Sequence, residues 1–274
     1  MQPTKPVRPY RLGLNLFMLR LSRNWLKVVI AILGVYVGLS IAAPLLMAAG
    51  LEGPARVLYT IYAPFCHQFA FRSVYIGGEQ AFYPRAIAQS GLTPYELYVY
   101  NDPTFLSSYD YYYARSHNGQ PAPAPTAEEL AAGFTPWMQF ASKDFAGNAE
   151  MGYKTTLCAR DEAIYIGLLI GAIIYSRPVV RRRLRPVPIL LFLFVGVLPI
   201  ALDGLSQLLG YPPFNAWPPR ETLPFFRVST GLLFGLMSAW LAFPYLNESF
   251  KETQRAIELK LANAGIALQS RPGS

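Results

Sequence analysis

Four long runs of uncharged, mostly apolar residues alternate with charged segments along the chain. The runs comprise residues 28–51, 163–176, 186–202 and 228–247. A transmembrane helix needs about 20 such residues to cross a hydrocarbon core of about 30 Å. The pattern therefore predicts an all-α membrane protein with four transmembrane helices. With flanking residues included, we place them at residues 28–51, 158–176, 186–209 and 226–246.

Lysine and arginine are unevenly distributed among the segments that join these helices. Of the 24 basic residues, 15 lie in residues 1–27, in the loop 177–185 and in the tail 247–274. Basic segments favour the cytoplasmic side of a membrane. With four spans these three segments lie on the same side of the membrane. We therefore predict that both termini are cytoplasmic and that the protein is a multi-pass protein of the cytoplasmic (inner) membrane. The net charge of +8 is then a topology signal, and we predict no nucleic-acid partner because no basic soluble domain is evident.

The two terminal segments differ from the predicted spans. Residues 1–27 form a basic amphipathic pattern that is typical of a helix lying on the cytoplasmic leaflet, and residues 247–274 form an amphipathic tail. The first apolar run begins too late and is too long for a cleavable signal peptide. Both segments are expected to anchor the protein.

Residues 52–157 are predicted to form an extracytoplasmic cap, a name we use for this segment throughout. Within it, residues 79–136 are rich in tyrosine and are interpreted as an inserted, ordered lid. Thr126 and Glu129 have the spacing of a capping box, which predicts a short helix that begins after Thr126.

The second apolar run is too short to span a membrane by itself. It has 14 uncharged residues between Glu162 and Arg177, so the helix must begin earlier and include Cys158, Arg160 and Asp161 near the outer boundary. Cys158, Asp161 and Tyr165 recur at i, i+3 and i+7, which places them on one helix face.

The other two C-terminal runs also carry ionisable groups at their outer ends. Asp203 closes the third run and Gln207 follows one turn later, while Arg227 opens the fourth. Such groups are costly near hydrocarbon, so they pair with each other, face the bundle interior or mark a functional path. We predict ion pairs that join Arg160 or Arg227 to Asp161 or Asp203.

The two cysteines of the chain allow three interpretations. Cys66 and Cys158 lie on the predicted oxidising side, where a disulfide would form. Together with His67 and Asp161 they could instead hold a metal such as zinc, whose usual ligands are Cys, His and carboxylates. Free thiols are the third interpretation, and a nearby arginine would make one of them reactive.

The motifs around these residues resemble those of an uncharacterised bacterial integral-membrane family, domain of unknown function 2085. The matching elements are Cys66-His67-Gln68, Arg72-Ser73, Gly152-Tyr153, Cys158-Ala159-Arg160, Tyr165 with Gly167, Asp203-Gly204 with Gln207, and Arg227 with Gly231. The resemblance implies a four-helix fold and a shared outer site, but no reaction. Many members have a second cysteine where this chain has Asp161, so a Cys-x-x-Cys pair is absent here.

These observations predict an outward-facing site that binds a metal, a small ligand or an anionic lipid headgroup, with the question of catalysis left open. The predicted residues are Cys66, His67, Gln68, Arg72, Cys158, Arg160, Asp161, Tyr165, Asp203, Gln207 and Arg227. The lipid bilayer is the expected partner. The alternative is an accessory subunit of a larger membrane complex, stapled by a disulfide between Cys66 and Cys158.

Overall fold

The computed structural model describes residues 9–211 and 213–266. Residues 1–8 of the predicted N-terminal segment and 267–274 of the predicted tail lie outside the described residues. The α-helices are α1 Pro9–Ala48, α2 Glu52–Tyr62, α3 Glu96–Val99, α4 Pro103–Ser116, α5 Ala127–Ala132, α6 Pro136–Asp144, α7 Ala159–Tyr175, α8 Pro178–Arg183, α9 Ile189–Leu191, α10 Leu198–Gly210 and α11 Pro224–Asn263. The remaining elements are the 3-10 turns η1 Ala70–Arg72 and η2 Ala86–Ala88, the π-helical stretch η3 Phe192–Val197, and strands β1 Ser73–Gly77, β2 Gly147–Asn148 and β3 Gly152–Cys158.

Three helices of the described chain are long and apolar enough to cross a membrane. They comprise Leu12–Ala48 of α1, the continuous helix Ile189–Gly210 formed by α9, η3 and α10, and Pro224–Asn263, which is α11. The third predicted span exposes large apolar side chains, among them Leu190, Phe194 and Leu202 at 61–65%. Exposure of this kind over a whole helix fits contact with lipid. The protein is therefore a membrane protein with apolar helices that suit a bilayer.

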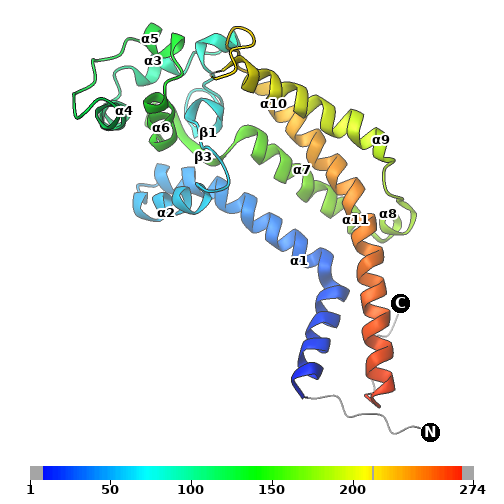
Figure 1. Ribbon diagram of the computed structural model, residues 1–274. Helices are drawn as coiled ribbons and strands as arrows, with labels where there is room; N and C mark the ends of the chain where they lie inside the picture. Colours follow the sequence, from blue (N-terminus) through cyan, green and yellow to red (C-terminus); the bar gives the residue numbers. More distant parts are fainter. Residues whose placement is uncertain (1–8, 212, 267–274) are drawn as a thin grey trace.

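Helix α7 is the fourth span that the sequence predicts. It starts at Ala159, before Glu162, as the short uncharged run required. With 17 residues it is about 26 Å long, slightly less than a usual span. That α7 crosses the membrane remains a prediction, although α7 lies in the bundle between α1 and α11 (Figure 1).

Glycines bring α7 and α11 into close contact. A Cβ atom on Gly167 would lie 2.7 Å from the carbonyl oxygen of Leu232, and one on Gly235 would lie 3.1 Å from the Cα of Gly167. A Cβ on Gly231 would clash with the carbonyl of Arg160. Small residues at such positions allow helix backbones to approach within a membrane, and here they fix the start of α7 against the start of α11.

The cap contains a sheet that the sequence did not predict. Strand β3 lies between β1 and β2 and pairs antiparallel with both. The prediction of an all-α protein is therefore wrong in the cap. The reason is that β3 is buried along almost its whole length, so it lacks the alternation of apolar and polar residues that marks a half-buried strand.

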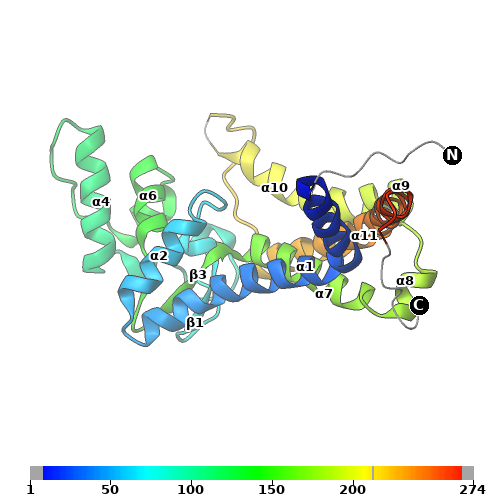
Figure 2. The same ribbon diagram turned by 90° about the horizontal axis from the view of Figure 1, so that it is seen from below.

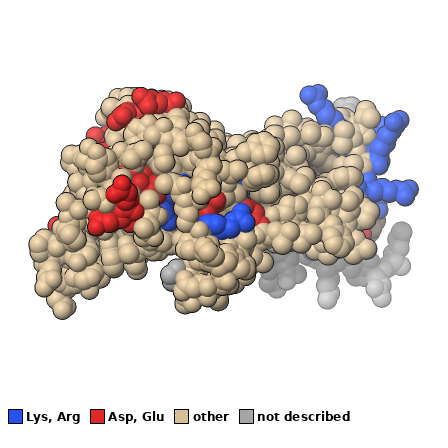
Figure 3. Space-filling view, turned by 90° about the horizontal axis from the view of Figure 1, so that it is seen from above, with Lys and Arg blue, Asp and Glu red and all other residues tan. Residues whose placement is uncertain are grey.

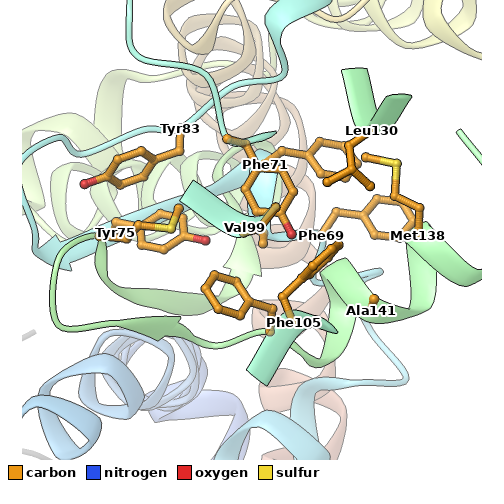
Figure 4. Packing of buried hydrophobic residues seen from close by; sticks show 13 residues of the cluster. Phe69, Phe71, Tyr75, Tyr83, Val99, Phe105, Leu130, Met138 and Ala141 are labelled. Carbon is orange, nitrogen blue, oxygen red and sulfur yellow. The ribbon is translucent and has the colours of Figure 1, made fainter. Parts of the chain in front are cut away.

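An aromatic core holds the cap together beside this sheet. Figure 4 shows Phe69, Phe71 and Tyr75 packed with residues of helices α4, α5 and α6, including Phe105, Leu130 and Met138. The predicted capping box at Thr126 and Glu129 is confirmed at the start of α5. Residues 79–136, which we predict to be an insertion, thus supply part of the core that packs on the segment after Cys66.

The ends of α1 and α11 farthest from the cap pack against each other. Both helices have 40 residues and so extend about 60 Å, beyond the hydrocarbon thickness. Trp25 stacks on Phe250 with ring centroids 5.3 Å apart, and Arg23 pairs with Glu258 at 2.7 Å. The predicted terminal segments are hence continuous with the spans, and the described ends of the chain lie far from the cap (Figures 1 and 2).

Candidate functional site

The two cysteines meet where the cap joins the helical bundle. Cys66 follows α2, and Cys158 is the last residue of β3 and directly precedes α7. The pairing of β1 with β3 places Ser73 opposite Cys158, which folds the Cys66 segment back onto the start of α7. The two Sγ atoms lie 2.8 Å apart and both side chains are buried. Both cysteines are free thiols.

Two backbone N–H groups, one from the turn at Cys66-His67-Gln68 and one from the end of β3, point at the sulfur of Cys66. Gln68 adopts a left-handed conformation with φ 55°. Its N–H donates to Cys66 Sγ at 3.4 Å, and the N–H of Cys158 donates to the same sulfur at 3.1 Å. The neighbouring thiol and burial raise the pKa of Cys66, while the Gln68 N–H lowers it. The thiol of Cys66 therefore keeps its proton at neutral pH unless a cation displaces it.

Asp161 completes a compact group of three ligand atoms. Its carboxylate and the two Sγ atoms all lie within 4.8 Å of one another. Within residues 9–211 and 213–266, Asp161 has no hydrogen-bond or ion-pair partner. The predicted ion pair to Asp161 is thus not formed in the described chain. Partial burial of an unpaired carboxylate costs free energy, and a bound cation would offset that cost.

Of the other residues that we predicted beside the cysteines, Tyr165 and Gln68 pack into the protein and His67 does not. Tyr165 packs beside the cysteines, and its ring lies 4.6 Å from that of Tyr36 in α1. The side chain of Gln68 is buried and donates to the carbonyl of Tyr59 at 2.9 Å. His67 is exposed, with its ring 5.4 Å from that of Phe69, and it is not part of the thiol–carboxylate group.

Glu221 is the centre of a second, buried cluster that joins the cap to the bundle. It pairs with Arg72 from η1, and with Arg227 of α11 at 2.8 Å. The Tyr211 hydroxyl also donates to it at 3.1 Å. Although burial raises the pKa of Glu221, the charges of Arg72 and Arg227 outweigh it and lower the pKa. Glu221 is therefore ionised at neutral pH.

Asp203 organises a third cluster on α10. Its carboxylate pairs with Arg160 and accepts from the Thr222 hydroxyl, and Arg220 lies 3.8 Å away. With its amide oxygen facing these groups, Gln207 accepts from the Thr222 N–H at 2.8 Å and from Arg227 at 3.3 Å. The predicted Arg160–Asp203 pair is confirmed. Each of the three predicted arginines, 72, 160 and 227, is thus matched to a carboxylate.

Three polar residues of this region were missed or undervalued at the level of sequence. Lys154 in β3 is 1% exposed and donates to the carbonyls of Gln68, Ser142 and Lys143. Burial lowers the pKa of Lys154 to about 7. Ser40 of α1 donates to Glu162 at 2.7 Å, beside the cysteines. Only Glu221 had a sequence signal, because it precedes Arg227 by six positions.

Comparison with known proteins supports the membrane assignment and leaves the activity open. Residues 150–241 match a family described as "Predicted membrane protein (DUF2085)". An uncharacterised protein of the archaeon Methanocaldococcus jannaschii is 32% identical over 98 residues, which cover 35% of this chain and 56% of that protein. The chain thus matches about half the length of this relative. No solved structure matches.

The matched region contains part of the candidate site. It includes Cys158, Asp161, Asp203 and Arg227, whereas Cys66 and its neighbours lie before residue 150. The family match therefore does not include Cys66, and its place in the site comes from the structure of this chain.

Proposed function

We propose that this protein binds a thiophilic divalent cation, such as zinc, through Cys66, Cys158 and Asp161 at the junction of cap and bundle. The observation that carries the proposal is a group of two thiols and one carboxylate whose ligand atoms lie within 4.8 Å of one another, the carboxylate having no partner among the described residues. Zinc is commonly held by cysteine thiolates and carboxylates in four-coordinate sites. Backbone N–H groups directed at Cys66 would stabilise the thiolate that a metal requires.

The charges around the group favour a cation over an anion. Arg72, Arg160 and Arg227 are already paired with Glu221 and Asp203, so an anionic lipid headgroup would have to displace those carboxylates. The carboxylate of Asp161 has no such partner in the described chain. A metal ion would supply the missing positive charge and replace the thiol protons.

Three protein ligands would leave one coordination position for water, for a substrate or for His67, which adjoins Cys66. Sites of three ligands plus water are typical of catalytic zinc, whereas closed sites of four are typical of structural zinc. The arginine-rich helix α8 follows the end of α7 that lies away from this site (Figure 1). Figure 3 shows Lys and Arg side chains at one end of the molecule, and this distribution favours an extracytoplasmic position of the site.

Metal content measured on the purified protein tests the proposal. We expect close to one zinc per chain in the wild type and loss of that zinc in Cys158→Ser and Asp161→Asn. Asp110→Asn is the matched control, because Asp110 lies in α4 and accepts from the Ala122 N–H. Asp161→Cys should restore or tighten binding, since it replaces a carboxylate by a thiolate. Zinc that is unchanged in Cys158→Ser would contradict the proposal.

The contact of 2.8 Å between the sulfur atoms favours one second candidate, a disulfide between Cys66 and Cys158. Such a bond would staple the cap to α7 and suit an accessory subunit that docks through its cap. In that case the purified protein contains no zinc, both thiols react only after reduction, and a stoichiometric partner is recovered after mild solubilisation.

A further inference from the structure

At the end of the molecule away from the cysteines, the helices enclose a large groove with a basic rim. Its volume is about 1670 Å³, larger than the roughly 300–1,000 Å³ of ordinary ligand pockets. The groove is lined by the N-terminal half of α1, the end of α7, helix α8 with the loop after it, and the C-terminal half of α11. We call this cavity the basic groove.

Positive charge dominates the groove because several of its arginines have no acidic partner in the part of the chain that the structure describes. Six basic and two acidic side chains line it. The two acidic residues are already paired, Glu258 with Arg23 and Glu248 with Lys251, both at 2.7 Å. The four remaining arginines, which have no carboxylate partner within the described ranges, are Arg181, Arg182, Arg185 and Arg255.

Part of the groove wall is apolar. Leu184 and Pro186 are partly exposed there and Tyr245 is exposed, above the buried rings of Trp25 and Tyr175. An anion that is wholly soluble would gain nothing from this wall. A ligand with a negative head and a hydrocarbon tail would use both the rim and the wall.

The position of the groove along the helices corresponds to the membrane boundary. The apolar helix Ile189–Gly210 begins four residues after Arg185, and Ile189 is 58% exposed. Trp240 is 37% exposed and donates from its indole N–H to the carbonyl of Arg185 at 3.0 Å. Tyr245, which lines the groove, is 63% exposed. Tryptophan and tyrosine of this kind are typical of the headgroup level.

From these contacts we infer that the basic groove binds an anionic phospholipid. The phosphate of the lipid contacts Arg181, Arg182, Arg185 and Arg255, and an acyl chain lies along the wall formed by Leu184, Pro186 and Tyr245. Basic pockets between membrane helices at the headgroup level bind acidic lipids in this way. The site is independent of the proposed metal site, which lies at the other end of the bundle.

Native mass spectrometry of the detergent-purified protein tests this inference, with phosphatidylglycerol and phosphatidylcholine added in turn. We expect the wild type to retain phosphatidylglycerol in preference to phosphatidylcholine. The variant with Arg181→Gln, Arg182→Gln, Arg185→Gln and Arg255→Gln should lose that preference. Each arginine removed should weaken retention by about fivefold.

A charge-matched variant separates the groove from a general attraction to basic surface. It carries Arg20→Gln, Arg177→Gln, Arg183→Gln and Lys260→Gln, four exposed residues at the same end that do not line the groove. Its lipid preference should remain. If combined variants fail to fold, Arg182→Gln and its neighbour Arg183→Gln make the same comparison singly. Equal loss in both variants, or no lipid preference in the wild type, would overturn the inference.

Soluble glycerol phosphate distinguishes a lipid from a free phosphate compound. We expect it to leave the bound phosphatidylglycerol in place, because it offers nothing to the apolar wall. Displacement of the lipid by glycerol phosphate would show that the groove serves a soluble anion, and the lipid assignment would then be wrong.

Discussion

The Sγ atom of Cys66 lies 2.8 Å from that of Cys158, although 92 positions separate the two residues in the sequence. This contact joins the cap to the start of α7, and the carboxylate of Asp161 lies within 4.8 Å of both sulfurs. The backbone N–H of Cys158 also donates to Cys66 Sγ. A metal at this point would cross-link the two parts of the protein as well as provide a reactive centre.

Glu221→Gln should strongly destabilise the junction between cap and bundle. The change leaves Arg72 and Arg227 without a carboxylate in a buried site, which costs about 3 kcal/mol or more. We expect a lower midpoint of thermal unfolding in detergent. Glu252→Gln, at an exposed position of α11, should leave the midpoint unchanged, and equal midpoints for both variants would show that the cluster contributes little.

The cluster also predicts acid sensitivity. Because Arg72 and Arg227 lower the pKa of Glu221 below 4.5, its stabilising contribution is complete above that value and is lost as the pH falls through the folded-state pKa. Unfolding curves of the wild type and of Glu221→Gln should therefore converge only below about pH 4.5. Curves that converge at neutral pH would contradict the assigned charge of Glu221.

Lys154 should make the cap more stable in mild alkali. Burial lowers its pKa from 10.5 to about 7, so the unfolded chain binds more protons than the folded one between these values. Stability linked to Lys154 therefore rises with pH from about 7 to about 10. The measurement is the free energy of unfolding of the wild type minus that of Lys154→Met at several pH values. A flat difference would mean that the three carbonyl acceptors preserve an ordinary ammonium group.

Gly235→Ala should separate α7 from α11. The new methyl group would clash with the carbonyl of Ile164 and lie 3.1 Å from Gly167 Cα, and overpacking of this kind costs about 1–3 kcal/mol. Gly38→Ala in α1 is the matched control, since its Cβ meets no atom within 4 Å and alanine favours the helix. Loss of stability in Gly235→Ala but not in Gly38→Ala, measured by thermal unfolding, checks the close contact.

The sequence predicted the parts of the fold that depend on length and hydropathy. Three of the four predicted spans correspond to long apolar helices, because uninterrupted apolar runs need no knowledge of tertiary contacts. The strands of the cap could not be predicted in this way. Strand β3 is buried on both faces, and its pairing with β1 depends on residues about 80 positions away along the chain.

The candidate site was predictable where helical spacing or scarcity of a residue gave a signal. Asp161 and Tyr165 lie one turn apart on α7, and Cys66 is the other cysteine of the chain. The helical spacing was wrong for Cys158, which is the last residue of β3 with an extended backbone directly before α7. The roles of Glu221 and Lys154 depend instead on partners from several elements, which no local pattern encodes. His67 was expected among the metal ligands because it adjoins Cys66. Its side chain is exposed instead, next to the left-handed backbone of Gln68.

A count of reactive thiols in native membranes, by the mass shift after alkylation, tests the central claim most directly. The account predicts that Cys66 and Cys158 are protected until a chelator is added, with no need for reductant, and that Asp161→Asn removes the protection. Thiols that stay blocked with chelator and react only after reduction would show a disulfide. Thiols that react under every condition would leave no metal at this site, and either result would contradict the account.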